Sequence, residues 1–231
     1  MIRGPLGSRA SIGGPLGSGR GGAAAWYLAG GVSAANCVAA YQPKGAADYA
    51  TSKVNLANPG TYNATDGTAY PTWAAATGWT FTGVSSQYLY TGIIPTNNQT
   101  WSGIAYFTVG GTAGTPFAAA GNSGGATPYF GVEPNNAGVN RRYFAGFIVT
   151  VTPPLTGTHS MAVAGNQGYL DGSPDGGAIA TAGTSFNQIA IGRLGVYSGF
   201  YFTGNIAAIA IYNATLTATQ ISLISAAMAA L

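Results

Sequence analysis

The stretch that most constrains the fold is the C-terminal segment that begins at Tyr201. Within it, Ile206–Tyr212 is a short apolar run rich in isoleucine, which predicts a strand buried on both faces. The pair Gly204-Asn205 before this run predicts a turn. After the run, apolar residues recur at helical spacing, and Thr217 precedes Gln220 by three residues, as in a capping box. We therefore expect the chain to close with a buried strand, a turn and a short amphipathic helix.

Upstream of that segment, short apolar runs alternate with glycine, proline and asparagine. Cys37–Tyr41, Ile104–Val109 and Tyr143–Val151 are typical of strands, and Pro134–Asn140 is expected to be a turn. Many short strands with such punctuation predict an all-β sandwich. The length of 231 residues fits a single domain of this class, and 47% hydrophobic residues can fill its core.

A resemblance to a known family agrees with this pattern. The C-terminal segment resembles the end of laminin-G-like, concanavalin-A-like domains, and shorter matches follow in order from about residue 25 to residue 231. The resemblance implies a jelly-roll β-sandwich, most similar to versions carried on phage and prophage structural proteins. The residues that carry it are Gly204, Ile206, Ile209, Ile211, Tyr212, Asn213, Leu216, Thr217, Gln220 and Ile221, with Cys37–Tyr41, Asn55–Gly60, Gly78–Gly83, Tyr88–Gly92, Tyr169–Gly172 and Ile191–Arg193 upstream.

Residues 1–24 differ in composition from the rest and predict an extended N-terminal arm before a sandwich domain at 25–231. The pentapeptide Gly-Pro-Leu-Gly-Ser occurs twice in them, and a segment so rich in glycine, proline and serine cannot bury enough surface to fold alone. A flexible leader or an expression remnant is one interpretation, and a secretion signal fits less well. We favour an arm that orders against a partner, through Arg3, Leu6, Arg9, Leu16 and Arg20.

The arm and the domain also differ in net charge. Only 6% of the residues are charged, against about 25% in average proteins. The arm has three arginines and no acidic residue, whereas the rest balances at zero, so the net charge of +3 gives no support for nucleic-acid binding by the domain. A surface so poor in charge favours association. We expect a homo-oligomer, with a trimer favoured, and neither a membrane span nor a cofactor.

The residues that could carry catalysis or hold a metal are few. Five carboxylates without a paired strand motif do not fit a glycoside hydrolase, and His159 is the lone histidine, so we expect no enzyme. Asp171 and Asp175 each precede a glycine and predict turns. Laminin-G-like relatives often carry aspartate where this chain has Ala207 and Ala208, so no metal site is expected, with Asp66 as a remote calcium candidate.

A sugar site requires exposed aromatic faces beside amide, hydroxyl or charged groups. Two stretches offer such residues, although most of the 27 aromatic residues of a sandwich fill its core. The candidate glycan-binding residues are Tyr129, Asn135, Asn136, Arg141 and Arg142 in the first stretch and Tyr197 and Phe200 in the second.

These observations lead to two hypotheses about function. The first is a non-enzymatic phage virion surface protein, such as a capsid decoration, head fibre or tail appendage. It would be made in the host cytoplasm, attached to other virion proteins by its arm, and able to bind a cell-surface glycan. The alternative is an extracellular carbohydrate-binding or adhesion module, secreted or displayed by a bacterium.

Overall fold

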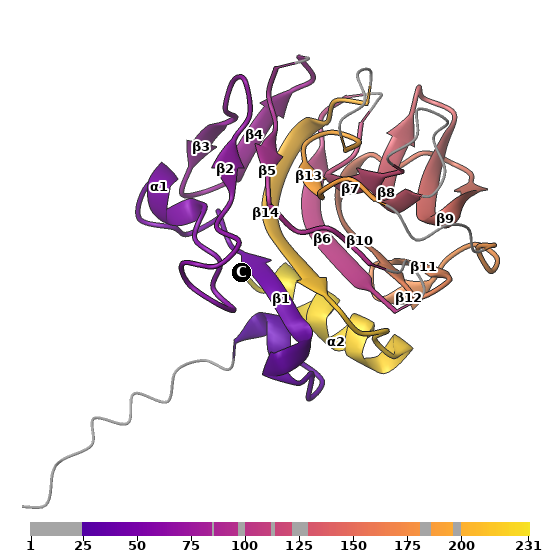
Figure 1. Cartoon of the computed structure of the whole chain (residues 1–231). Coiled ribbons are helices and arrows are strands. Elements are labelled where there is room, and N and C mark those ends of the chain that lie inside the picture. Colours follow the sequence, from indigo (N-terminus) through magenta and orange to yellow (C-terminus); the bar gives the residue numbers. More distant parts are fainter. Residues whose placement is uncertain are drawn as a thin grey trace, which may run out of the picture.

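The protein is an all-β jelly-roll sandwich of two antiparallel sheets with one helix at its C-terminal end, as predicted (Figure 1). This computed structural model describes residues 25–84, 86–96, 100–111, 114–121, 129–180, 186–195 and 200–231. The arm at residues 1–24, with all five of its candidate anchoring residues, and Tyr197 lie outside the described residues.

The larger sheet has eight strands in the order β12-β11-β10-β6-β14-β4-β3, and β1 pairs with β14 beside β4. The long strand β14 therefore organises the sheet, because it pairs with β6 along one edge and with both β4 and β1 along the other. The bounds are β1 Cys37–Tyr41, β3 Thr72–Ala74, β4 Gly78–Thr82, β6 Ser102–Val109, β10 Gly157–Ala164, β11 Gln167–Leu170, β12 Ser173–Pro174 and β14 Thr203–Tyr212.

The smaller sheet has six strands in the order β2-β5-β13-β7-β8-β9. Its strands are β2 Thr65–Asp66, β5 Leu89–Tyr90, β7 Phe117–Ala120, β8 Tyr129–Asn136, β9 Asn140–Val151 and β13 Ala190–Ile191. Short helical turns lie near the start of the domain, with η1 Trp26–Leu28 and η2 Ala34–Asn36 before β1 and α1 Tyr49–Ser52 between β1 and β2. The side chain of Asp48 caps α1 by accepting a hydrogen bond of 2.7 Å from the amide of Thr51.

The main core lies between the two sheets. Residues at alternating positions of each strand point inward, as the period of two along a strand requires, and the large side chains Trp79, Phe117 and Phe130 are fully buried there. The two sheets therefore each keep one outer face that packs on something else or meets solvent.

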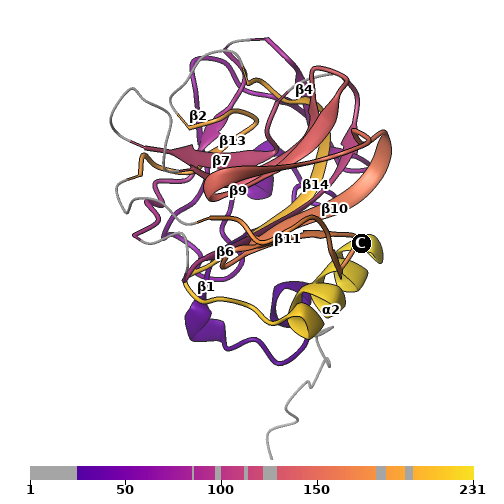
Figure 2. The same cartoon turned by 90° about the vertical axis from the view of Figure 1, so that its right-hand side faces the viewer.

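The helix α2, Ala218–Ala229, covers part of the outer face of the larger sheet and makes a third layer (Figure 2). Thr217 and Gln220 form the predicted capping box at its start. Ile221, Ile224 and Met228 are fully buried in a second core, against apolar residues of β1, β6, β10 and β14. The predicted closing strand, turn and amphipathic helix are thus confirmed.

One predicted turn is shorter than expected, and another is wrong. Strand β8 continues through Pro134 to Asn136, and the chain reverses only at Ala137 and Gly138, which both have positive φ. Gly204 and Asn205 lie inside β14, paired with β4 and β6. Gly204 is needed there because a Cβ at this position would come 2.1 Å from the carbonyl oxygen of Thr108.

Candidate functional site

A row of polar side chains crosses the outer face of the larger sheet where α2 does not reach. The row joins Thr72, Thr80, Asn205, Thr108 and Thr158, which are directly opposite one another on the neighbouring strands β3, β4, β14, β6 and β10. The hydroxyls of Thr108 and Thr158 are 2.8 Å apart, and the amide of Asn205 donates to Thr80 Oγ1 at 3.3 Å. At about 4.8 Å per strand, the row is about 19 Å long. We call these five residues the polar row.

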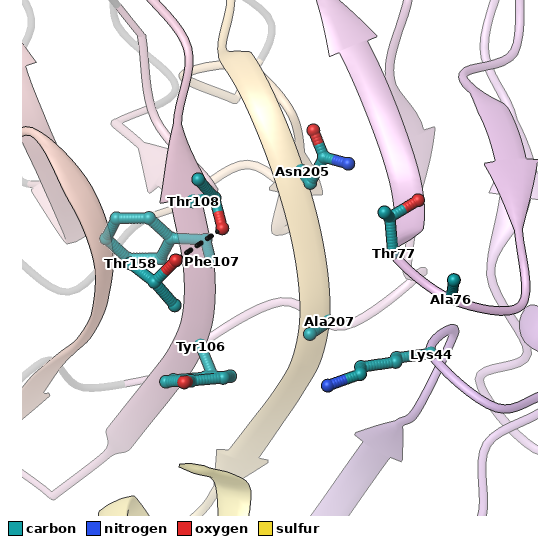
Figure 3. A pocket seen from close by; sticks show the side chains of 9 residues that line it. All are labelled: Lys44, Ala76, Thr77, Tyr106, Phe107, Thr108, Thr158, Asn205 and Ala207. Atoms are coloured by element: carbon teal, nitrogen blue, oxygen red, sulfur yellow. Dashed lines mark hydrogen bonds between the residues drawn. The ribbon is translucent and has the colours of Figure 1, made fainter.

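A cavity of about 300 Å³ lies beside the centre of the polar row (Figure 3). Its floor is formed by β6, β10 and β14, with Tyr106, Thr108 and Asn205 among the lining side chains. Lys44, from the loop after β1, reaches toward Ala207 from the side opposite Tyr106. The cavity thus combines an aromatic ring, two types of neutral hydrogen-bonding group and an ammonium group.

An irregularity in β14 lies at the floor of this cavity. Ile206 is opposite Phe107 and Ala208 is opposite Tyr106, so Ala207 is an extra residue, as in a β-bulge. The carbonyl oxygen of Ala207 accepts a hydrogen bond of 3.3 Å from the amide of Lys44. The bulge therefore fixes the loop that carries Lys44 against the sheet. The small side chains of Ala76 and Ala207 line the cavity there and leave room for a ligand.

A second cavity, of about 380 Å³, continues from the first toward α2. Both are lined by Tyr106 and Thr158, so the two form one depression, which we call the trough. His159 Nδ1 and Asp171 Oδ2 are 2.8 Å apart in this second part, and Ser222 of α2 is among its lining residues. The trough therefore has a cationic end at Lys44 and an end with a carboxylate at Asp171.

A third cavity, larger than these two, has a different chemistry. It measures about 750 Å³ and is lined mainly by apolar groups of η1 and the end of α2, including Trp26, Tyr27 and Leu231. Gln42 lines it too, but its side-chain oxygen already accepts a hydrogen bond of 2.9 Å from the indole of Trp26. This groove lies beside Ala25, where the described part of the chain begins, and it lacks the converging polar groups of the trough.

Two of the predicted glycan-binding residues have internal partners. Arg141 is buried and donates two hydrogen bonds to Asp175, of 2.6 and 2.7 Å, and one of 2.6 Å to the carbonyl of Pro153. Asn135 is buried and accepts a hydrogen bond of 2.8 Å from the amide of Gly138 in the turn after β8. Both side chains stabilise the fold in these positions, so we give them no part in the proposed site.

Asp175, expected only to form a turn, belongs to this buried network as well. Its carboxylate also accepts a hydrogen bond of 2.5 Å from Tyr143 Oη. Burial raises the pKa of Asp175, but the hydrogen bonds from Arg141 and Tyr143 outweigh burial and hold its pKa below the ordinary value. The network ties the loop after β12 to β9.

Three other predicted residues lie on the outer face of the smaller sheet. Tyr129 and Phe200 pack on Ala118, Ala120 and Leu194. Arg142 Nη1 is 3.3 Å from the buried carboxylate of Glu133, and this burial raises the pKa of Glu133 to about 6 although the arginine lowers it. Asn136 pairs with Asn140 at the turn, at 3.3 Å. The structure thus brings Tyr129, Arg142 and Phe200 to one face, while Asn136 lies at its end.

The carboxylate of Asp66 interacts with two other side chains. It lies 2.9 Å from Lys53 Nζ and accepts a hydrogen bond of 2.5 Å from Tyr49. Within the described ranges, no group of three or more metal-ligating side chains comes together. No helix in the same ranges is long and apolar enough to cross a membrane.

Comparisons with known proteins give relatives by fold alone. No protein-family model and no curated protein matches the sequence. Among solved structures, the Trypanosoma rangeli sialidase in complex with sialic acid has a TM-score of 0.60 and 16% identity over 83% of this chain and 33% of its own. A mutant of that sialidase displaying trans-sialidase activity has a TM-score of 0.59 and 16% identity over 85% and 34%. Domain 4 of an extracellular GH43 arabinanase from Geobacillus stearothermophilus, in complex with arabinotriose, has a TM-score of 0.48 and 16% identity over 82% and 98%.

These structures correct the expectation that the protein is no enzyme. The sialidases that share this fold are enzymes, and the chain spans about a third of their length. The expectation rested on the scarcity of carboxylates within 231 residues, but the sandwich of this chain corresponds to only one part of such enzymes. A sandwich poor in acidic residues therefore does not exclude an enzyme. The likeness does confirm the predicted jelly-roll β-sandwich fold.

Proposed function

We propose that this sandwich is a carbohydrate-binding domain whose ligand lies in the trough on the outer face of the larger sheet. The observation that carries the proposal is the polar row, which places five hydroxyl or amide side chains in register on the part of the sheet's outer face that α2 does not cover. Sugars present many hydroxyls at spacings of a few ångströms, and such groups exchange hydrogen bonds with amides and hydroxyls. We therefore assign the polar row to hydrogen bonding with the hydroxyls of a sugar.

Tyr106 supports the same ligand class. Its ring is half-buried between the two parts of the trough, so each part offers an aromatic wall beside polar groups. Binding sites for small molecules typically combine such apolar walls with a few well-placed polar groups. A sugar ring has apolar C–H faces that can pack on the tyrosine while its hydroxyls reach the row. The sialic acid in a solved structure of the same fold adds support from a carbohydrate-binding relative.

The test is binding of the purified full-length protein to a glycan array, followed by calorimetry on the best ligand. We expect Tyr106→Ala to weaken binding at least about tenfold, because it removes the aromatic wall from both parts of the trough. Tyr70→Ala is the matched control, since Tyr70 is 61% exposed and lies outside the trough. Unchanged affinity in Tyr106→Ala, or no affinity for any glycan in the native protein, would contradict the proposal.

Display on a phage virion remains a second proposal, and the uneven charge favours it. All of the net charge of +3 comes from Arg3, Arg9 and Arg20 in the arm, so attachment to other virion proteins would use the arm and leave the trough free. Assembly as a trimer belongs to the same proposal. The test compares the full chain with residues 25–231 by mass photometry and by binding to virions. Loss of oligomers and particle binding without the arm would support display, and identical behaviour would favour an extracellular carbohydrate-binding module.

A further inference from the structure

The trough contains a basic side chain, Lys44, that has no ion-pair or aromatic partner among the residues the structure describes. Each of the other basic residues in the described part of the chain has a carboxylate or an aromatic ring beside it, whereas Lys44 has neither. Each acidic side chain likewise has a partner other than Lys44. The pairs are Lys53–Asp66, Arg141–Asp175, Arg142–Glu133 and His159–Asp171, Arg193 lies over Tyr88, and Asp48 caps α1.

The backbone holds Lys44 in place while its side chain stays available. The amide of Lys44 donates to Ala207 on β14, and its carbonyl accepts a hydrogen bond of 3.3 Å from the side chain of Gln42. The preceding residue, Pro43, accepts a hydrogen bond of 2.8 Å from the indole of Trp73. The backbone around Lys44 is therefore fixed on both sides, and the ammonium group extends over the cavity toward Ala207 (Figure 3).

We infer that the ligand of the trough is an acidic glycan whose anionic group lies against the Lys44 ammonium. This inference rests on the proposed carbohydrate-binding function. An ammonium group offers three donors and a full positive charge, and its hydrogen bonds to an anion are stronger than those between neutral groups. Carboxylated sugars and sulfated sugars both meet this requirement, and the test separates them.

The opposite end of the trough gives the ligand a direction. Asp171 lines that end, its side chain is 52% exposed, and its partner His159 is charged only when protonated. A second anionic group there would be repelled by the carboxylate, so that end suits a neutral sugar that bonds to Ser222 and Thr158. The ligand would therefore place its acidic unit at Lys44 and a neutral unit beyond Tyr106.

The test measures affinities of the full-length protein for matched pairs of oligosaccharides at low salt. The pairs are sialyllactose and lactose, trigalacturonic acid and its methyl ester, and a sulfated disaccharide and its unsulfated form. We expect the acidic member of the carboxylated or the sulfated pairs to bind about tenfold more tightly, the effect of one charge-assisted hydrogen bond. This preference should shrink as salt rises, because ions screen the contact.

Variants of Lys44 isolate its contribution. Lys44→Met should remove the preference for the acidic member of each pair, and Lys44→Arg should keep the preference because it keeps the charge. Lys53→Met is the control, since Lys53 pairs with Asp66 outside the trough. Equal melting temperatures would exclude a folding defect.

The outcomes distinguish the inference from the function on which it rests. Equal affinity for acidic and neutral sugars in the native protein, with weaker binding of both in Tyr106→Ala, overturns the inference and keeps the function. A preference that persists in Lys44→Met also overturns the inference. Absence of binding to every sugar overturns both.

Discussion

The outer face of the larger sheet has two halves, of which one is covered by α2 and the other carries the polar row. In the half nearer the chain's last residues, β14 presents Ala208, Ala210 and Tyr212, and α2 covers them. In the other half, the same strand presents Asn205 to the polar row, and the described residues place no helix over it. The change occurs at the bulge at Ala207. One strand thus contributes to stability at one end and to the proposed ligand site at the other.

The covered half should be the more sensitive to truncation. Ile224 of α2 is fully buried in the second core, so Ile224→Ala removes buried methyl groups and leaves a cavity. We expect the free energy of unfolding to fall by about 2–5 kcal/mol, measured by urea denaturation. Leu223→Ala is the control on the same helix, because Leu223 is 47% exposed, and it should cost no more than about 0.5 kcal/mol. Equal costs for the two variants would mean that α2 does not pack on the sheet as described.

The outer face of the smaller sheet differs from both halves because it contains a buried carboxyl group, that of Glu133. The raised pKa of Glu133, about 6 against an ordinary 4.5, means that the folded state binds a proton more tightly than the unfolded state does. The contribution of Glu133 to stability is therefore greatest below pH 4.5 and falls by about 2 kcal/mol as the pH rises through 6. Urea denaturation between pH 4 and 7 measures this slope.

The variant Glu133→Gln separates this effect from other titrating groups. The difference in unfolding free energy between the native protein and the variant should depend on pH between 4.5 and 6 and level off above this range. Asp175 contributes with the opposite sign and at lower pH, because its pKa is lowered, and it is present in both proteins. A difference that does not change with pH would refute the assignment to Glu133.

Two hydroxyl pairs provide a matched test of burial on the two halves. Ser160 and Ser225 are hydrogen-bonded and buried under α2, whereas Thr108 and Thr158 are hydrogen-bonded and exposed in the polar row. Ser225→Ala leaves Ser160 without this partner and should cost about 1 kcal/mol, after a gain in helix propensity. Thr158→Val keeps the side-chain shape and should change stability by less than about 0.5 kcal/mol. Thermal unfolding of both variants measures the difference, and a larger cost for Thr158→Val would reverse the comparison.

The covered half could be predicted from the sequence and the polar row could not. Helical spacing of Ile221, Ile224 and Met228 and the capping box at Thr217 are local signals, and they led to the helix that the structure has. The polar row depends on register between strands far apart in the chain: Asn205 pairs with Thr80 and with Thr108. Local sequence does not specify such pairing.

The row was also hidden by a misleading local signal. Gly204-Asn205 is typical of a turn, but here the glycine allows close approach to the carbonyl of Thr108, and the asparagine belongs to the row. The candidate glycan-binding residues show the opposite error. Arginine is a residue type that often binds ligands, but the side chain of Arg141 donates hydrogen bonds to Asp175 within the fold. Thr108, between the apolar residues Phe107 and Val109 of β6, was the available sign of a polar outer face.

The last prediction has the smallest effect on stability and separates the two halves most directly. Asn205→Val removes the amide at the centre of the polar row and introduces a residue favoured in strands, at a half-exposed position. We expect the free energy of unfolding to stay the same or rise by up to about 0.5 kcal/mol, because the bond to Thr80 is replaced by better strand propensity. Affinity for the glycan should fall about three- to tenfold, the effect of one neutral hydrogen bond. The substitution would then keep or raise stability while it lowers affinity, as expected for a residue that contributes to ligand binding and not to stability. Calorimetry and urea denaturation on the same sample measure both, and a variant that loses stability and keeps its affinity would place Asn205 with the structural half.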